Sequence, residues 1–180
     1  MNIYIDNCYS WVGYHIANDF LEHGWTVCSQ NMPRNEGEDH LAMFLGRNSR
    51  FHSDDFIENP DARILIETEC SEEPSLTVLA NERKWHISCP FLIGEWMPLD
   101  GDHLYNGCES ELVYTCELSD FLRQSLNGNL PNGHVQFISR HSKRVPLDCS
   151  GVAVSLSELA PEEKLMKVKD HFNRFRHLYI

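Results

Sequence analysis

The stretch from Ile3 to Ile16 reads IYIDNCYSWVGYHI and decides the expected fold. A short apolar run ends at Asp6, and apolar residues at helical spacing begin at Trp11. Gly24 stands where the residue after a helix adopts a left-handed conformation, and residues 26–28 suit a second strand. Strand, helix and strand joined by short connections are typical of a parallel α/β sheet.

The same alternation continues along the chain. Residues 62–68 and 85–89 are short apolar runs that predict strands, and a short helix is expected between them at 76–84. Later elements are expected as a helix over 117–126, strands at 135–138 and 152–156, and a further helix over 40–45. A final helix begins at Pro161.

The final helix has an apolar stripe and a basic outer face. The stripe comprises Leu165, Val168, Phe172, Phe175 and Tyr179. The outer face is expected to hold Lys164, Lys167, Lys169, Arg174 and Arg176, as a solvated surface or as a docking surface for an acidic partner.

Four ordered patches of sequence resemble one family, the extended short-chain dehydrogenases/reductases, which include the NAD-dependent epimerases and dehydratases. Residues 11–16, WVGYHI, resemble the F-I-G-x-H-L end of that family's first motif, T-G-A-T-G-F-I-G-x-H-L. Residues 62–71 are similar to V-x-R-F-V-Y-x-S-S, residues 85–94 to V-x-I-L-R-P-x-x-V-Y-G, and residues 111–118 to D-F-V-Y-V-D-D-L. The match spans residue 1 to about residue 140.

The resemblance implies a Rossmann-like fold in one domain. We expect residues 1–180 to form a parallel sheet flanked by helices and reduced in strand number, because the chain is much shorter than a typical member. The missing residues fall mainly between 30 and 62 and after Gly94. Residues 95–180 would then correspond to a reduced substrate-binding, C-terminal part.

The resemblance also implies a dinucleotide site at the first turn. Such a turn needs glycines where the backbone bends and approaches a pyrophosphate, and free amides at the start of the helix. Here Gly13 is the one family glycine, and Asn7 and Ser10 replace the other two, with Asn tolerating positive φ. The expected cofactor-binding residues are Asn7, Ser10, Trp11, Val12 and Gly13.

The cofactor would be NAD or NADP. The second strand ends in residues 28–31, CSQN, which lack the acid that holds the ribose hydroxyls of NAD, and Arg34 lies a few residues on. The sequence leaves both cofactors open.

The residues that carry the family's catalysis are absent or displaced. The family uses a Tyr, a Lys four residues later, and a Ser or Thr that positions the substrate. The Ser/Thr position falls near Thr68, but no Y-x-x-x-K occurs between Thr68 and Trp85. We therefore expect a degenerate protein that acts as a binding or assembly module. The alternative is an active oxidoreductase or epimerase that acts on a nucleotide-linked sugar through non-standard residues, with Thr68 as the tentative catalytic group.

Composition excludes several other classes. Acidic residues outnumber basic ones by 27 to 15, which disfavours nucleic acids and anionic membranes as partners. No stretch reaches the roughly 20 apolar residues of a membrane span, and the first residues do not resemble a signal peptide, so we expect a soluble, cytoplasmic protein. Seven cysteines without a C-x-x-C pair predict buried thiols and no metal site.

A homodimer is also expected. A reduced sheet would expose apolar edges and faces, and a second copy would cover them through the last helix or the helix near Leu118 to Leu126.

Overall fold

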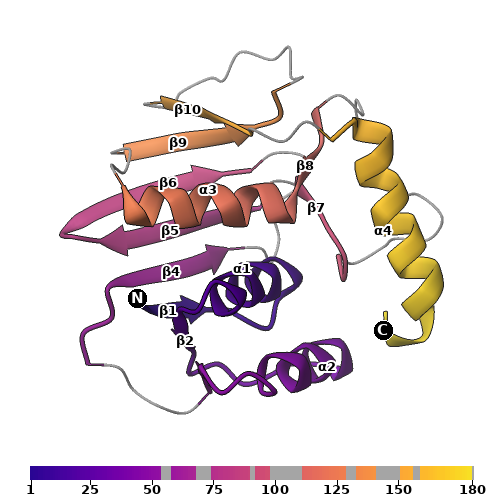
Figure 1. The fold of residues 1–180 in the computed structure, drawn as a ribbon, viewed down its shortest axis with the longest axis horizontal. Coiled ribbons are helices and arrows are strands. Elements are labelled where there is room, and N and C mark those ends of the chain that lie inside the picture. Colours follow the sequence, from indigo (N-terminus) through magenta and orange to yellow (C-terminus); the bar gives the residue numbers. More distant parts are fainter. Residues whose placement is uncertain are drawn as a thin grey trace.

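The computed structural model describes eight segments of the chain: residues 1–53, 58–67, 74–89, 92–97, 111–128, 133–140, 151–155 and 159–179. Within them, eight strands form one sheet in the order β10-β9-β6-β5-β4-β1-β2-β3 (Figure 1). These strands are β1 Asn2–Asp6, β2 Thr26–Cys28, β3 Phe51–His52, β4 Ala62–Glu67, β5 Ser75–Ala80, β6 Arg83–Ser88, β9 Gly133–Ile138 and β10 Gly151–Val154.

Four helices and a second, small sheet complete the described architecture. The helices are α1 Trp11–Glu22, α2 Glu36–Leu45, α3 Thr115–Asn127 and α4 Pro161–Phe175, and the short 3-10 helix η2, Arg176–Leu178, follows α4. Strands β7 Leu92–Ile93 and β8 Val113–Tyr114 form a parallel pair. The protein is therefore α/β, with a mostly parallel sheet.

The amino-terminal half has the strand order of a nucleotide-binding fold. Strands β3, β2, β1 and β4 are neighbours in that order and run parallel. Helix α1 connects β1 to β2, as the sequence predicts, and Gly24 follows the helix with a φ of 80°. The order 3-2-1-4 is that of the classical dinucleotide-binding sheet, so the described strands are compatible with a Rossmann-like fold.

Strand β5 makes the sheet mixed. It runs antiparallel to both β4 and β6, whereas β6, β9 and β10 run parallel to one another. The expectation of a sheet that is parallel throughout is therefore wrong. The expected reduction in strand number is also not seen, because eight strands exceed the six of the classical order.

The helix expected at residues 76–84 is a β-hairpin. Strands β5 and β6 meet at Asn81 and Glu82, which both have positive φ, at 51° and 61°. Positive φ at both central residues is the geometry of a type I′ turn, whose twist matches that of the flanking strands. Leu76, Val78 and Ala80 belong to the main core, and the intervening Thr77 is buried as well, so pairing within the sheet overrides the helical appearance of this stretch.

One face of the sheet carries the main core. Helices α1 and α3 lie side by side in front of the strands (Figure 1). Alternate residues of the strands point to these helices and are almost completely buried, among them Ile5, Ile64, Val78, Trp85 and Phe137. Residues whose side chains point to the other face of the sheet, such as Arg63 and His86, are only half-buried. The helical layer therefore determines which face of each strand is apolar.

Helix α4 is fastened by a buried ion pair. Lys164 Nζ lies 2.9 Å from Glu117 Oε1 and donates a hydrogen bond of 3.0 Å to the Leu112 carbonyl. The Glu117 carboxylate also accepts from the Tyr114 amide at the start of α3. The Lys164 side chain is 1 % exposed, so its expected place on the solvated outer face is wrong. Its partner lies 47 residues away, which helix periodicity does not reveal.

We expect Lys164→Met to lower the free energy of unfolding by about 3–5 kcal/mol, because it leaves the Glu117 charge buried without a partner. Urea denaturation measures the loss. The double variant Lys164→Met/Glu117→Gln should recover most of it, since glutamine retains the acceptor of the capping box. Lys169→Met, on an exposed position of the same helix, should change stability by less than about 0.5 kcal/mol. Equal losses in both lysine variants would contradict the prediction.

Candidate functional site

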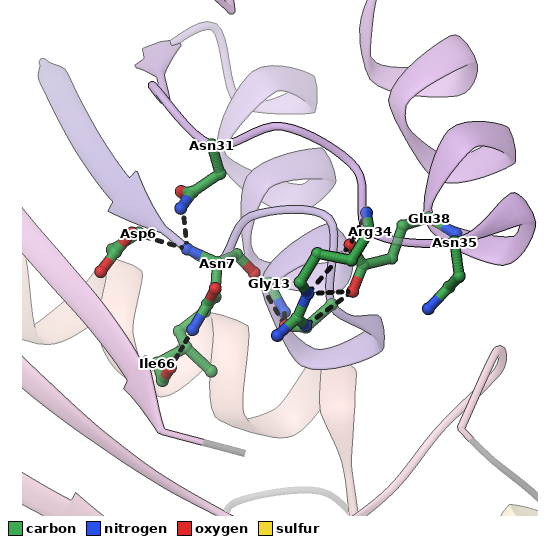
Figure 2. A network of polar contacts seen from close by, with 9 residues as sticks. Asp6, Asn7, Gly13, Asn31, Arg34, Asn35, Glu38 and Ile66 are labelled. Atoms are coloured by element: carbon green, nitrogen blue, oxygen red, sulfur yellow. Dashed lines mark hydrogen bonds and ion pairs between the residues drawn. The ribbon is translucent and has the colours of Figure 1, made fainter. Parts of the chain in front are cut away.

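The turn after β1 bends at Asn7. This residue has a φ of 56°, in the left-handed region that asparagine tolerates better than most residues. Its side-chain Nδ2 donates to the Ile66 carbonyl on β4 at 2.9 Å, and Figure 2 shows it reaching between the ends of the two strands. Asn7 therefore supplies the bend that a glycine provides in the related motif, and also joins β1 to β4.

Ser10 and Gly13 close the turn onto helix α1. The Ser10 hydroxyl donates to the Asn7 carbonyl at 2.8 Å and accepts from the Gly13 amide at 3.1 Å, so Ser10 is the N-cap of the helix. A Cβ atom on Gly13 would lie only 2.2 Å from the Asn7 carbonyl oxygen. Gly13 thus permits close packing of helix against turn, the role of the third glycine in dinucleotide-binding turns.

Several amides of the turn already have partners within the protein. The Asn7 amide donates to Asn31 Oδ1 at 2.8 Å and to Asp6 Oδ1 at 3.1 Å (Figure 2). The Ser10 amide donates to the Asn7 carbonyl. Of the five residues expected to bind a cofactor, only Trp11 and Val12 have amides that find no acceptor among the described residues. The structure brings all five together in one turn, with most of its hydrogen bonds made internally.

Arg34 lies after β2, where a basic side chain could hold the 2′-phosphate of NADP. Its guanidinium pairs with Glu38, with Nη2 at 2.6 Å from Oε1, and its backbone amide donates to the same carboxylate (Figure 2). The hydrogen bonds that the Arg34 guanidinium donates to Glu38 raise the pKa of Arg34. Glu38 itself is 8 % exposed and lies in the first turn of α2, which Asn35 caps. This ion pair connects the segment after β2 to the first turn of α2.

The tentative catalytic residue Thr68 lies outside the described residues, within 68–73. The next described strand, β5, bears on the catalytic residues that the resemblance implies. In the family that the sequence resembles, the chain after this point carries the catalytic Tyr and Lys, four residues apart. Here residues 75–80 form β5, a strand in which residues four apart do not lie together on a helical turn.

A second cluster of polar and aromatic residues lies near the start of α1, and sequence reasoning missed it. His15 Nε2 lies 2.9 Å from the Glu95 carbonyl and 3.5 Å from the Glu95 carboxylate. Trp96 has a φ of 65°, its ring stacks on Tyr179 at 5.3 Å between centroids, and its amide donates to the Tyr179 hydroxyl. His171 Nδ1 lies 2.7 Å from the same hydroxyl. The cluster joins residues up to 83 positions apart, so no local motif signals it.

Burial controls the ionisation of this cluster. Desolvation lowers the pKa of His15 and of His171, although Glu95 acts in the opposite direction on both. Desolvation, followed by the neighbouring Glu95 carboxylate, raises the pKa of Tyr114. His15 is therefore mainly neutral near pH 7, and its contact with Glu95 is a hydrogen bond more than an ion pair.

The described cysteines form no metal site. Cys8, Cys28 and Cys89 are buried, as expected, whereas Cys116 is exposed. Desolvation raises the pKa of Cys8 to about 12, so this thiol is neutral and a poor nucleophile. No group of three or more metal-ligating side chains occurs within the part of the chain that the structure describes. None of the helices described there has the length and apolar character of a membrane span.

The chain has no match among protein-family models, and no significant match among curated proteins or solved structures. Its α/β architecture and the geometry of its first turn are the observations on which a functional interpretation depends.

Gly13→Ala should lower the free energy of unfolding by about 3 kcal/mol, because its Cβ would collide with backbone atoms of Asn7 and Cys8 that cannot move independently. Chemical denaturation monitored by tryptophan fluorescence measures this effect. Gly151→Ala is the matched control, since the nearest atom to a Cβ there is 4.0 Å away. A loss below about 0.5 kcal/mol in Gly13→Ala would refute the close-packing role.

Acidification should destabilise the protein partly through His15. Because its folded pKa lies below its unfolded value, the unfolded chain binds the proton more tightly, and stability falls as the pH drops below about 6.5. Urea titrations at about pH 7.5 and about pH 5.5 should show a smaller loss in His15→Gln than in the wild type. Identical pH dependence in wild type and His15→Gln would exclude this contribution.

Proposed function

We propose that this chain is a binding or assembly module built on a Rossmann-like core, in which the turn that holds a dinucleotide in related folds has a structural role. The observation that carries the proposal is the position of Asn7. The Asn7 amide donates a hydrogen bond to the Asn31 side chain, which follows β2, and the Asn7 side chain donates to the Ile66 carbonyl of β4. Both hydrogen bonds lie at the edge of the sheet where β1 and β4 have their carboxyl ends. This edge of the sheet is where dinucleotide-binding folds hold their ligand.

Three further observations support the proposal. The Arg34 guanidinium is engaged by Glu38, so a 2′-phosphate would have to compete with a charge-assisted pair. Asp6 lies next to the turn and accepts from the Asn7 amide, and its negative charge would oppose a pyrophosphate. Strand β5 also occupies the sequence position at which the related family has its catalytic Tyr and Lys. Each feature weakens a different step of cofactor binding or hydride transfer.

The alternative is an active NAD- or NADP-dependent oxidoreductase or epimerase that acts on a nucleotide-linked sugar. The observation that favours it is the start of α1, where the Trp11 and Val12 amides have no acceptor among the described residues. Such amides, together with the helix dipole, attract anions. Catalysis would then depend on non-standard groups, with Thr68 as the candidate.

Thermal unfolding with NAD, NADH, NADP and NADPH separates the two functions. A ligand present at about 100 times its dissociation constant adds about 2.7 kcal/mol to stability, which raises the melting temperature measurably. We expect no increase with any of the four dinucleotides. An increase in the melting temperature with one of them would favour the enzyme, provided that the increase is lost when the first turn is altered.

Ser10→Asp tests that dependence. The aspartate carboxylate can still accept from the Gly13 amide, and its charge repels a pyrophosphate from the same amides. It loses the hydrogen bond that the serine hydroxyl donates to the Asn7 carbonyl, so each shift is measured against the same variant without dinucleotide. A dinucleotide-induced shift that disappears in Ser10→Asp would overturn the proposed module and support the enzyme. Substitution of Gly13 is unsuitable for this purpose, because any side chain there collides with the Asn7 backbone.

Assembly with a second copy is part of the proposal. The helices first expected to form the interface use their apolar residues within the chain: Leu118, Leu122 and Leu126 of α3 are buried in the main core, and Val168 of α4 is buried beside Tyr114. A dimer interface therefore requires another apolar surface.

A further inference from the structure

Strand β10 is an edge strand whose outer side is open among the described residues. It pairs with β9 on one side and has no further neighbour in the sheet (Figure 1). The Ser155 amide donates to the Ile138 carbonyl of β9. Because backbone groups alternate sides along a strand, those of Ala153 also face β9, whereas those of Val152 and Val154 point outward.

The side chains of β10 make this edge unusually apolar. Val152 and Val154 are each 46 % exposed and lie on the sheet face opposite α3. The strand reads Gly-Val-Ala-Val and contains no charge and no proline. Natural edge strands are normally protected by lysine, proline, a bulge or short length. The opposite edge, β3, has only two residues, whereas β10 has four and carries neither a lysine nor a proline.

The other face of β10 borders an apolar groove. The groove has a volume of about 670 Å³ and lies between α3 and the last two strands. Its apolar lining includes Phe121 and Phe137, whose rings stack at 4.9 Å between centroids, together with Ala153 of β10. Apolar surface is thus available on both faces of the strand as well as along its hydrogen-bonding edge.

We propose that β10 pairs antiparallel with β10 of a second copy of this chain, about a twofold axis perpendicular to the sheet. Such an axis places the same face of both sheets on the same side of the dimer, so residues that stand opposite each other must point to the same face. The register centred on Ala153 satisfies this condition, and it places Val152 opposite the partner's Val154 and Ala153 opposite the partner's Ala153. The two eight-stranded sheets become one continuous sheet, and the inference rests on the assembly role proposed above.

This register satisfies the outward backbone hydrogen-bonding groups of β10. Val152 and the partner's Val154 form a hydrogen-bonded pair, and the symmetric pair does the same, so the outward amides and carbonyls of both strands gain partners. Four valine side chains meet on one face, and the two grooves meet beside Ala153 on the other. A second copy fits because the strand is complementary to itself and has no charge that would require an opposite charge in a different protein.

Disulfide trapping tests the register. Ala153 and the partner's Ala153 form a non-hydrogen-bonded pair with Cα atoms about 4.5 Å apart, within the range of about 4.4–6.8 Å that a disulfide requires. Ala153→Cys should therefore give a covalent dimer on mild oxidation, detected by non-reducing electrophoresis. Val152→Cys is the matched control, because its two copies lie diagonally, beyond disulfide reach. Equal cross-linking of wild type, Val152→Cys and Ala153→Cys would overturn the register.

Light scattering with size-exclusion chromatography tests the interface itself. The wild type should have twice the 20.9 kDa mass of the chain, and Val154→Lys should reduce it to one chain mass. Because Val154 is exposed, the variant should retain the wild-type melting profile at low concentration, whereas Met43→Lys, at another exposed apolar position, should remain dimeric. A wild-type monomer at all concentrations would overturn both the pairing and the assembly role. A dimer that persists in Val154→Lys would overturn the β10 pairing alone.

Discussion

The close approach of Gly13 to the carbonyl of Asn7 is the constraint on which the rest of the fold depends. With 2.2 Å between that oxygen and the position of an absent Cβ, helix α1 can start directly against the turn. This contact sets the direction in which α1 leaves β1, and α1 in turn provides the surface on which α3 packs. The side chain of Asn7 extends this constraint to the neighbouring strand, because its hydrogen bond to the Ile66 carbonyl joins the end of β1 to β4.

The parts of the structure that sequence reasoning predicts are those set by neighbours in the chain. The β1 strand, the bend at Asn7 and helix α1 follow from residues within one short segment, and so does the start of α4 at Pro161. The hairpin at 75–88 was missed because its turn has Asn81-Glu82 in place of the usual Asn-Gly, and glutamate seldom adopts positive φ. Lys164 and the Trp96–Tyr179 contact were missed because their partners are distant in sequence.

The first turn shows how one geometry can serve two purposes. A turn that binds phosphate must leave amides unsatisfied until the ligand arrives, which costs stability in the free protein. Here Asn31 and Asp6 accept from the Asn7 amide and Ser10 accepts from the Gly13 amide, so these two amides are satisfied without a ligand, whereas those of Trp11 and Val12 have no acceptor among the described residues. The backbone of this turn has the bend and the close helix packing of a dinucleotide-binding turn, whereas the side chains around it determine what that shape is used for.

The antiparallel β5 also affects how such a chain can fold. Parallel strands come together only after a long connection has closed, and the bond between Asn7 and Ile66 spans 59 residues. A β-hairpin forms from adjacent residues, typically within about 1–10 μs. Strands β4, β5 and β6 follow one another in both sequence and space, so this meander gives the chain a low-contact-order nucleus onto which β1 and, later, β9 can add.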